Sequence, residues 1–370
     1  MTSALRCGLW LWLGRDLRSC GAGRPRAPLL HEQTDIGSLH RRRDHGAATR
    51  VRSHTLMGMP EKSKSVRDAI GELFTHEVLT RADLVAQGMS THQITAAVRE
   101  RRLLRARRGV YVRPGMPPQV LAAVRIGGRL TCLSLLEVIG IFVHSRPALH
   151  VCVPAHLSRS RGRRPKNAIL HWGGRAESWH DHVVSLGEAI RQSVLCQDPR
   201  ATIATLDSLL HHRVIDRDGL VELLAGLPKR FQTLIALVDG SAESGPETYM
   251  RLILRSLGVR FECQVQVEGV GRVDFLVEGW LIIECDSKRF HEGWDKQVED
   301  RARDLAAAKL GFVTIRPLAS DLLFDRTQVR AQVQAVVAAF STRLARSSVP
   351  QLRRTGRDSA SLRRYTTSLL

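Results

Sequence analysis

The sequence predicts a mixed α/β protein: a winged helix-turn-helix, then an α+β middle region, then a C-terminal mixed sheet flanked by helices. Residues 239–343 show apolar patterns in the order helix, three strands, helix, strand, helix. Residues 80–112 hold two short helical patterns and a basic hairpin pattern. Residues 116–238 mix helical and strand patterns. These three observations divide the chain into 65–115, 116–238 and 239–343.

The two ends of the chain differ in composition from these regions. Residues 1–64 carry a short apolar patch and basic runs such as "LHRRRDHGAATRVRSH". The patch is too short and its flanks are too basic for a secretory signal. We expect a disordered basic extension there, with Met57 or Met59 as an alternative start, and a loose basic, Ser-rich tail at 344–370.

The charge is strongly basic, with 56 Lys and Arg against 36 Asp and Glu, a formal net charge of +20. Such a surplus favours a polyanionic partner, nucleic acid first, because basic side chains release counterions from phosphates. The alternative is an Arg-rich solvated surface that reflects a genome of high GC content. The surplus by itself identifies no site.

The seven cysteines are scattered and form no CxxC motif, and several lie in apolar runs. This usage is typical of reduced thiols in a cytosolic protein. The longest apolar runs fall short of the ~20 residues that a membrane span requires. We therefore expect a cytoplasmic protein with no membrane partner.

Residues 65–115 predict the DNA-binding module. Thr80 is expected to cap a helix over 81–87, and Ser90 a second helix over 91–101. "LLRARRGVYV" predicts a hairpin that bends near Gly109. A helix that reads a groove beside a wing that grips phosphate needs basic and amide side chains. The candidates here are His92, Gln93, Arg99, Arg101, Arg105, Arg107 and Arg108. The alternative is a small helical adaptor with a solvated basic face.

The middle region contains a group of residues that invites a metal interpretation. They are His150, Cys152, His156, His171, His180 and His182. Their spacings match no zinc motif, so we interpret them as strand-end and loop residues. Around them the patterns predict a helix, a Gly-Gly turn and a helix, then two strands, then three helices, the last capped by Asp216 or Asp218.

The stretch "GRVDFLVEGWLIIECDSKRFH", residues 271–291, predicts two apolar strands that nevertheless carry carboxylates. A two-residue turn would place Asp274 opposite Ile283. A three-residue turn over 278–280 instead pairs Val277 with Leu281 and places Asp274 opposite Glu284. The second register sorts charged residues to one face and apolar residues to the other, so we prefer it.

That register brings together two carboxylates with Cβ atoms ~5 Å apart, which repel unless a cation neutralises them. Mg²⁺, or Mn²⁺, prefers such oxygen ligands and keeps waters for a phosphate substrate. The expected metal ligands are Asp274, Glu284 and, from a helix start, Glu247. The alternative is a buried ion network in which Arg272 is the counterion.

The run "SGPE…GRVDFLV…LIIECDSKRFH…EDRARDLAAAKLGFVTIRP" resembles the very-short-patch-repair-like branch of the PD-(D/E)XK nuclease superfamily over about residues 239–339. The resemblance implies a restriction-endonuclease-like fold and Mg²⁺-dependent hydrolysis of DNA phosphodiester bonds. It implies catalytic roles for Glu247, Asp274 and Glu284.

The sequence departs from this superfamily where a Lys usually follows two residues after the second acid. Asp286 stands there and is itself a candidate catalytic residue, and the resemblance leaves Lys288 and His291 as the candidate groups that replace that Lys. In "EDRARDL", Arg301 is expected to contact substrate phosphate, or else to belong to a helix salt-bridge ladder. Arg316 is a weaker candidate of the same kind.

The front of the chain, "LTRADLVAQGMSTHQITAAVRERRLLRARRGVYV", is similar to the winged-helix domain of abortive-infection type IV antitoxins. This resemblance implies a DNA-binding, autoregulatory module, with a cognate toxin or a second copy of the chain as partner. Two functions follow: a DNA endonuclease in repair or in defence against phage and mobile elements, or a regulator whose nuclease-like domain does not cut. Neither implies a small-molecule cofactor.

Overall fold

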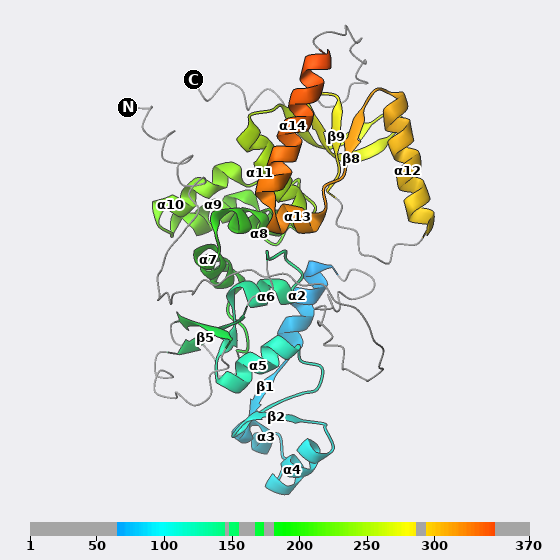
Figure 1. The fold of residues 1–370 in the computed structure, drawn as a ribbon. Helices are drawn as coiled ribbons and strands as arrows, with labels where there is room; N and C mark the ends of the chain where they lie inside the picture. Colours follow the sequence, from blue (N-terminus) through cyan, green and yellow to red (C-terminus); the bar gives the residue numbers. More distant parts are fainter. Residues whose placement is uncertain (1–64, 145–147, 155–166, 174–180, 286–293, 345–370) are drawn as a thin grey trace, which may run out of the picture. The chain divides into compact units, whose positions relative to one another are not determined.

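The computed structural model describes residues 65–144, 148–154, 167–173, 181–285 and 294–344 (Figure 1). The chain separates into two units, 1–64 and 65–370, and all described residues fall in the second. Helices and mixed sheets make this unit α/β, as expected. No helix within these ranges has the length and apolar character to cross a bilayer. The expected disordered end 1–64 lies outside the described residues, and so does the expected tail 344–370 except for Leu344, which ends helix α14 (Arg326–Leu344).

The first elements are α2 (Val66–Thr75), β1 (Val78–Thr80), α3 (Arg81–Ala86), α4 (Thr91–Arg99), β2 (Leu104–Arg107) and β3 (Val110–Val112). Both predicted caps are confirmed. Thr80 accepts a hydrogen bond from the backbone N–H of Asp83, and Ser90 accepts one from that of Gln93, each within a reciprocal capping box. The hairpin β2–β3 forms, and β1 joins it as a third strand that the sequence patterns did not predict.

The middle elements are α5 (Pro118–Ile126), β4 (Arg129–Leu130), α6 (Cys132–Val138), β5 (Leu149–Pro154), β6 (Ala168–Gly173), α7 (Leu186–Cys196), α8 (Pro199–His211), α9 (Arg217–Ala225), α10 (Lys229–Gln232) and the 3-10 helix η3 (Thr233–Leu237). β5 pairs with β6 in parallel and with β4 in antiparallel orientation. Of the two candidate caps of α9, Asp216 is the one that accepts the bond, from the N–H of Gly219 at 2.8 Å.

The C-terminal elements are α11 (Gly245–Leu257), β7 (Phe261–Val267), β8 (Gly271–Val277), β9 (Leu281–Ile283), α12 (Trp294–Lys309), β10 (Val313–Ile315), α13 (Ala319–Phe324) and α14 (Arg326–Leu344). They follow the predicted order, with the short α13 added. The sheet order is β10-β9-β8-β7, and β10 is parallel to β9.

The β8–β9 hairpin adopts the preferred register. Val277 pairs with Leu281 and Phe275 pairs with Ile283, so the three-residue turn is confirmed. Gly279 lies in this turn at φ 76°, a left-handed conformation that glycine adopts without steric cost. The same register, extended by one residue, places Asp274 opposite Glu284 where the pairing ends.

Helices cover both faces of this sheet (Figure 1). Leu281 and Ile283 pack in a core with residues of α11, α13 and α14. Ile282 points the other way and packs with Ala307 of α12. The alternation that sorts Glu284 with Ile282 therefore directs Glu284 toward α12 and not toward open solvent.

A buried ion pair fixes α11 against α8. Asp207 and Arg251 are 1% and 2% exposed, and Nη2 of Arg251 donates to Oδ2 of Asp207 at 2.7 Å. The hydroxyl of Thr248 and the backbone N–H of Asp239 also donate to Asp207, each at 2.7 Å. Burial raises the pKa of Asp207 to about 6, and Arg251 partly offsets this rise. Helix α11, which carries Glu247, is thus held against α8 by this ion pair and by the hydrogen bond from Thr248 to Asp207.

Candidate functional site

Asp274 and Glu247 form the centre of the acidic site. Glu247 lies in the first turn of α11, is 6% exposed, and accepts hydrogen bonds from the Ser244 hydroxyl at 2.7 Å and the Glu243 backbone N–H at 2.8 Å. Asp274 lies on β8, where the backbone N–H of Cys285 donates to its Oδ2 at 2.8 Å. These hydrogen bonds hold the carboxylates of Glu247 and Asp274 in fixed orientations.

Gln264 joins the two carboxylates, and sequence reasoning did not single it out. Its Nε2 donates to Oε2 of Glu247 at 2.9 Å and to Oδ1 of Asp274 at 3.4 Å. Gln264 lies opposite Asp274 in the β7–β8 register, where pairing is interrupted, and its φ is 52°. The sequence feature that could have identified Gln264 is that it is a polar residue on the strand that pairs with the strand of Asp274.

Both carboxylates have raised pKa values. Burial is the main cause for each, and the charge of Asp274 raises the pKa of Glu247 further. The N–H of Cys285 and the amide of Gln264 act in the opposite direction on Asp274. The pair therefore carries the mutual electrostatic cost expected of neighbouring carboxylates, in a partly desolvated place.

Glu284 is held differently from the other two acids. Nη2 of Arg303 donates to its Oε1 at 2.7 Å, and Nη1 of Arg316 contacts its Oε2. Arg316 also contacts Asp304 at 2.8 Å. The expected counterion, Arg272, instead pairs with Glu243. A partly buried ion network does exist around Glu284, but its cations come from α12 and from the end of β10.

The structure assigns different places to the two arginines proposed from the α12 region. Arg316 contacts two carboxylates, while Arg301 lies on an exposed part of α12. The α12 residue that reaches the site is Arg303, which also donates to the backbone oxygens of Arg272 and Val270. Its position two residues after Arg301 puts it on the sheet-facing side, a distinction that the sequence pattern did not make.

Three candidate catalytic residues, Asp286, Lys288 and His291, lie outside the described residues. In the described part of the chain, Glu247, Asp274 and Glu284 do not gather into a group of ligand atoms all within 4.8 Å of one another. The structure therefore brings Glu247 and Asp274 together. Glu284 lies beside them along the sheet and pairs with Arg303 and Arg316.

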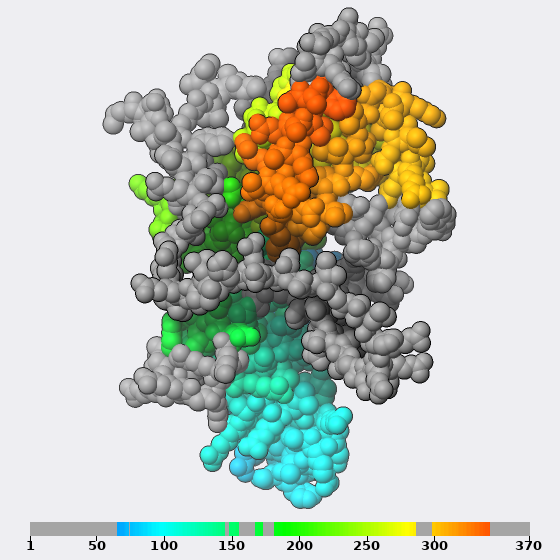
Figure 2. Space-filling view, viewed as in Figure 1, coloured from blue at the N-terminus to red at the C-terminus, as the bar shows by residue number. Residues whose placement is uncertain are grey.

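The predicted DNA-contacting residues of this module lie on α4, in the turn that follows it at Arg101, and on the β2–β3 hairpin. Exposed ones are His92, Gln93, Arg99, Arg101, Arg105 and Arg108, while Arg107 is partly buried. Figure 2 shows the cyan surface of this part of the chain. Gln93 has a local task, because its Oε1 accepts the backbone N–H of Ser90 at 2.7 Å and completes the capping box.

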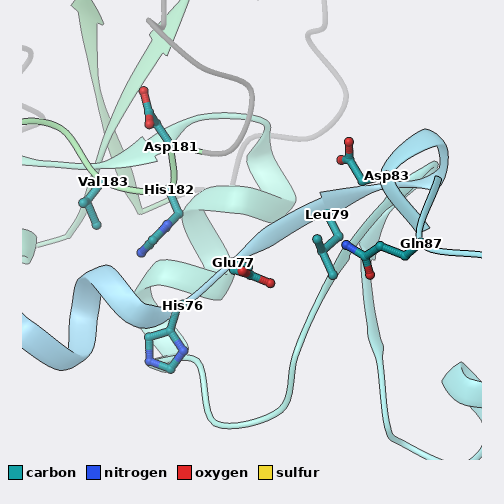
Figure 3. A pocket seen from close by; sticks show the side chains of 8 residues that line it. All are labelled: His76, Glu77, Leu79, Asp83, Gln87, Asp181, His182 and Val183. Atoms are coloured by element: carbon teal, nitrogen blue, oxygen red, sulfur yellow. The ribbon is translucent and has the colours of Figure 1, made fainter. Parts of the chain in front are cut away.

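A separate cleft of about 430 Å³ lies near the end of α2 and the start of α3 (Figure 3). Its lining includes the carboxylates of Glu77, Asp83 and Asp181. His182 also lines it, and Nε2 of that ring is bound to the backbone oxygen of Leu73 at 2.7 Å. An acidic lining repels phosphate, so this cleft does not fit the partner that the charge predicts.

Two of the middle-region residues that we did not expect to bind a metal lie in a cluster of potential metal ligands. His150 and His171 come together, and with them two residues that the sequence pattern did not connect, Cys132 and Cys196. Cys152 and His182 are not members of this group, and His156 and His180 lie outside the described residues. The spacing gave no zinc motif because the four residues belong to four separate elements.

Comparison with known proteins does not place the chain in a family. A scan against protein-family models found no matching family, and a search of curated proteins found no match. The resemblances to the nuclease superfamily and to the antitoxins therefore remain expectations.

Proposed function

We propose that the chain is a DNA-binding endonuclease whose C-terminal domain hydrolyses phosphodiester bonds with the help of Mg²⁺ or Mn²⁺. One observation carries this proposal: two carboxylates, the buried Glu247 and the half-buried Asp274, share the single amide group of Gln264. Burial raises the pKa of both carboxyl groups, and neighbouring carboxylates, Asp274 and Glu243 for Glu247 and Glu243 for Asp274, raise them further. Carboxylate oxygens at such a place are the ligands that hard divalent cations prefer.

Glu247 and Asp274 are the residues that would hold the ion. The ion would supply charge neutralisation at the scissile phosphate and a more acidic bound water. Cys285 fixes the orientation of Asp274 through its backbone N–H, and Ser244 does the same for Glu247 through its hydroxyl. The carboxamide of Gln264 presents an N–H to both acids, and rotation of its last torsion would present its oxygen instead.

The basic residues near the acidic site and on α4 are suited to binding the phosphates of the substrate. Arg303 and Arg316 concentrate positive charge beside the acids, and each is partly exposed, at 27% and 21%. A guanidinium in this position suits a phosphodiester oxygen. The exposed basic residues of α4 and its hairpin would add sequence-independent affinity through phosphate contacts.

A second function is favoured by one specific contact. Two arginines neutralise Glu284, so this carboxylate has no electrostatic need for a metal ion. That arrangement favours a DNA-binding regulator, similar to a type IV antitoxin, whose nuclease-like domain does not cut. The two functions differ in a single measurable property, which is metal-dependent strand cleavage.

The test is cleavage of a plasmid and of duplex, mismatched and single-stranded oligonucleotides by the purified chain with Mg²⁺ or Mn²⁺. We expect the wild type to cut and Asp274→Asn to lose activity. Glu268→Gln is the matched control, because Glu268 is an exposed acid in the turn that follows β7. Absence of metal-dependent cutting by the wild type on every substrate would reject the endonuclease. Intact DNA binding with steep salt dependence in the same samples would support the regulator.

A further inference from the structure

Four potential metal ligands converge in the middle region from four different elements. Cys132 is the first residue of α6, His150 is on β5, His171 is on β6, and Cys196 is the last residue of α7. One ligand atom from each lies within 4.8 Å of the corresponding atoms of the other three. In the described ranges of the chain, this is the only such group of three or more His, Cys, Asp or Glu residues.

The distances are close to those of a tetrahedral zinc site. Nδ1 of His150 and Nε2 of His171 are 2.9 Å apart, and Sγ of Cys196 is 3.8 Å from the same His171 nitrogen. Zinc bonds of ~2.3 Å to sulfur and ~2.0 Å to nitrogen place tetrahedral ligand atoms about 3.3–3.8 Å apart. The first of these two separations is about 0.4 Å shorter than that range and the second lies at its upper end, while all the ligand atoms lie within 4.8 Å of one another.

The sheet register explains why the two histidines meet. In the parallel pair β5–β6, His150 is aligned with Ile169, and Cys152 with His171. Because alternate residues share a face, His150 and His171 lie on the same face as diagonal neighbours. Their rings stack with centroids 5.2 Å apart. The cysteines then reach this face from the ends of two helices.

The positions of the ligands are fixed by further contacts. The backbone N–H of His150 donates to the Ser134 hydroxyl at 3.0 Å, and the Thr131 hydroxyl donates to the Gln192 carboxamide at 2.6 Å. These bonds connect β5 to α6 and the start of α6 to α7. Cys132 has φ 53°, a left-handed conformation that residues with a side chain rarely adopt. Local strain at a cysteine facing two histidines is typical of a functional position.

We propose that Cys132, His150, His171 and Cys196 bind one Zn²⁺ as a structural site. Two thiolates and two imidazoles form the Cys₂His₂ set that zinc selects. Four protein ligands complete the tetrahedron and leave no position for a substrate, so the role is structural and not catalytic. The ion would cross-link α6, β5, β6 and α7. This site is independent of the acidic site and of the function proposed for it.

Zinc binds cysteine as the thiolate, so its binding would release the protons that the two thiols still carry. The proposal stands on the convergence of the four ligand atoms.

The test is the metal content of the full-length chain, purified without a polyhistidine tag after one equivalent of Zn²⁺ is added to the reduced protein. We expect about one zinc per chain by mass spectrometry. Cys196→Ala should lose this zinc, and because Cys196 is exposed its removal leaves the core intact. The matched control is Cys263→Ala, since Cys263 is free and lies outside the cluster; it should keep the zinc.

Cobalt substitution gives a second and independent readout. The apo protein loaded with Co²⁺ should show thiolate-to-cobalt charge transfer and the visible bands of tetrahedral cobalt. Both should weaken in Cys196→Ala, which circular dichroism and gel filtration should show to be folded. A wild type that retains no zinc, a disulfide between Cys132 and Cys196, or full zinc retention in Cys196→Ala would each overturn the proposal.

Discussion

The buried pair Asp207–Arg251 supports a quantitative prediction about the replacement Arg251→Met. Both side chains are almost fully buried, and the pKa of Asp207 rises from 3.8 to about 6 although Arg251 is present. This rise corresponds to about 3 kcal/mol of cost for the charged carboxylate. Removal of one partner from a buried ion pair costs about 3–5 kcal/mol, because the other charge is left without compensation.

The cost should depend on pH in a definite direction. The folded-state pKa of Asp207 is raised, so its favourable contribution is full below pH 3.8 and is lost as the pH rises through about 6. Without Arg251 the pKa rises further, and the carboxyl stays protonated up to a higher pH. We therefore expect Arg251→Met to lower the free energy of unfolding by about 3–4 kcal/mol at pH 8 and by less than about half of that at pH 5.

The assay is urea unfolding followed by circular dichroism at pH 5 and at pH 8. The control is Arg255→Met, which removes an arginine of the same helix whose pKa is lowered by burial and by the charge of Arg251; it should change stability by less than about 1 kcal/mol and equally at both pH values. An equal loss at both pH values, or a loss below about 1 kcal/mol at pH 8, would refute the reasoning. A confirmed loss would show how firmly α11 positions Glu247.

Three other predictions concern the acidic site, the basic module and the core. Asp274→Asn should lower metal-dependent cleavage by at least about a hundredfold. It should also raise the midpoint of thermal unfolding at pH 7, because the folded-state pKa of Asp274 is raised and its charged form is therefore unfavourable there. Arg99→Ala with Arg108→Ala should reduce the slope of log affinity against log salt by about 2, and an unchanged slope would exclude phosphate contacts. Gly128→Ala should destabilise the fold by about 1–3 kcal/mol in urea, because an added Cβ would lie 2.4 Å from a methyl carbon of Val151; unchanged stability would contradict this packing.

Much of the local structure followed from short stretches of sequence. Thr80 and Ser90 cap their helices as expected, since a cap needs only a hydroxyl and backbone N–H groups within three residues. The order of elements in 239–343 followed from periodicity. The β8–β9 register followed from one comparison of two turns, because a shift of one residue exchanges every side chain between the two faces.

The counterions of the acidic site could not be obtained in this way. Glu284 is neutralised by Arg303 and Arg316, and Arg272 pairs with Glu243 instead. Which arginine reaches a carboxylate depends on the rotation of α12 against the sheet. Packing over the whole domain sets that rotation, and no local pattern records it.

The Cys132–His150–His171–Cys196 cluster is the clearest case of a feature that local sequence patterns could not predict. The nature of its residues was visible in the sequence, and so was the lack of a zinc spacing. Their meeting depends on the parallel pairing of β5 with β6 and on the helix ends that α6 and α7 bring to one face. Capping, periodicity and turn length act over a few residues and can be read along the chain. A site assembled from four elements depends on long-range contacts, which exist only after the chain has folded.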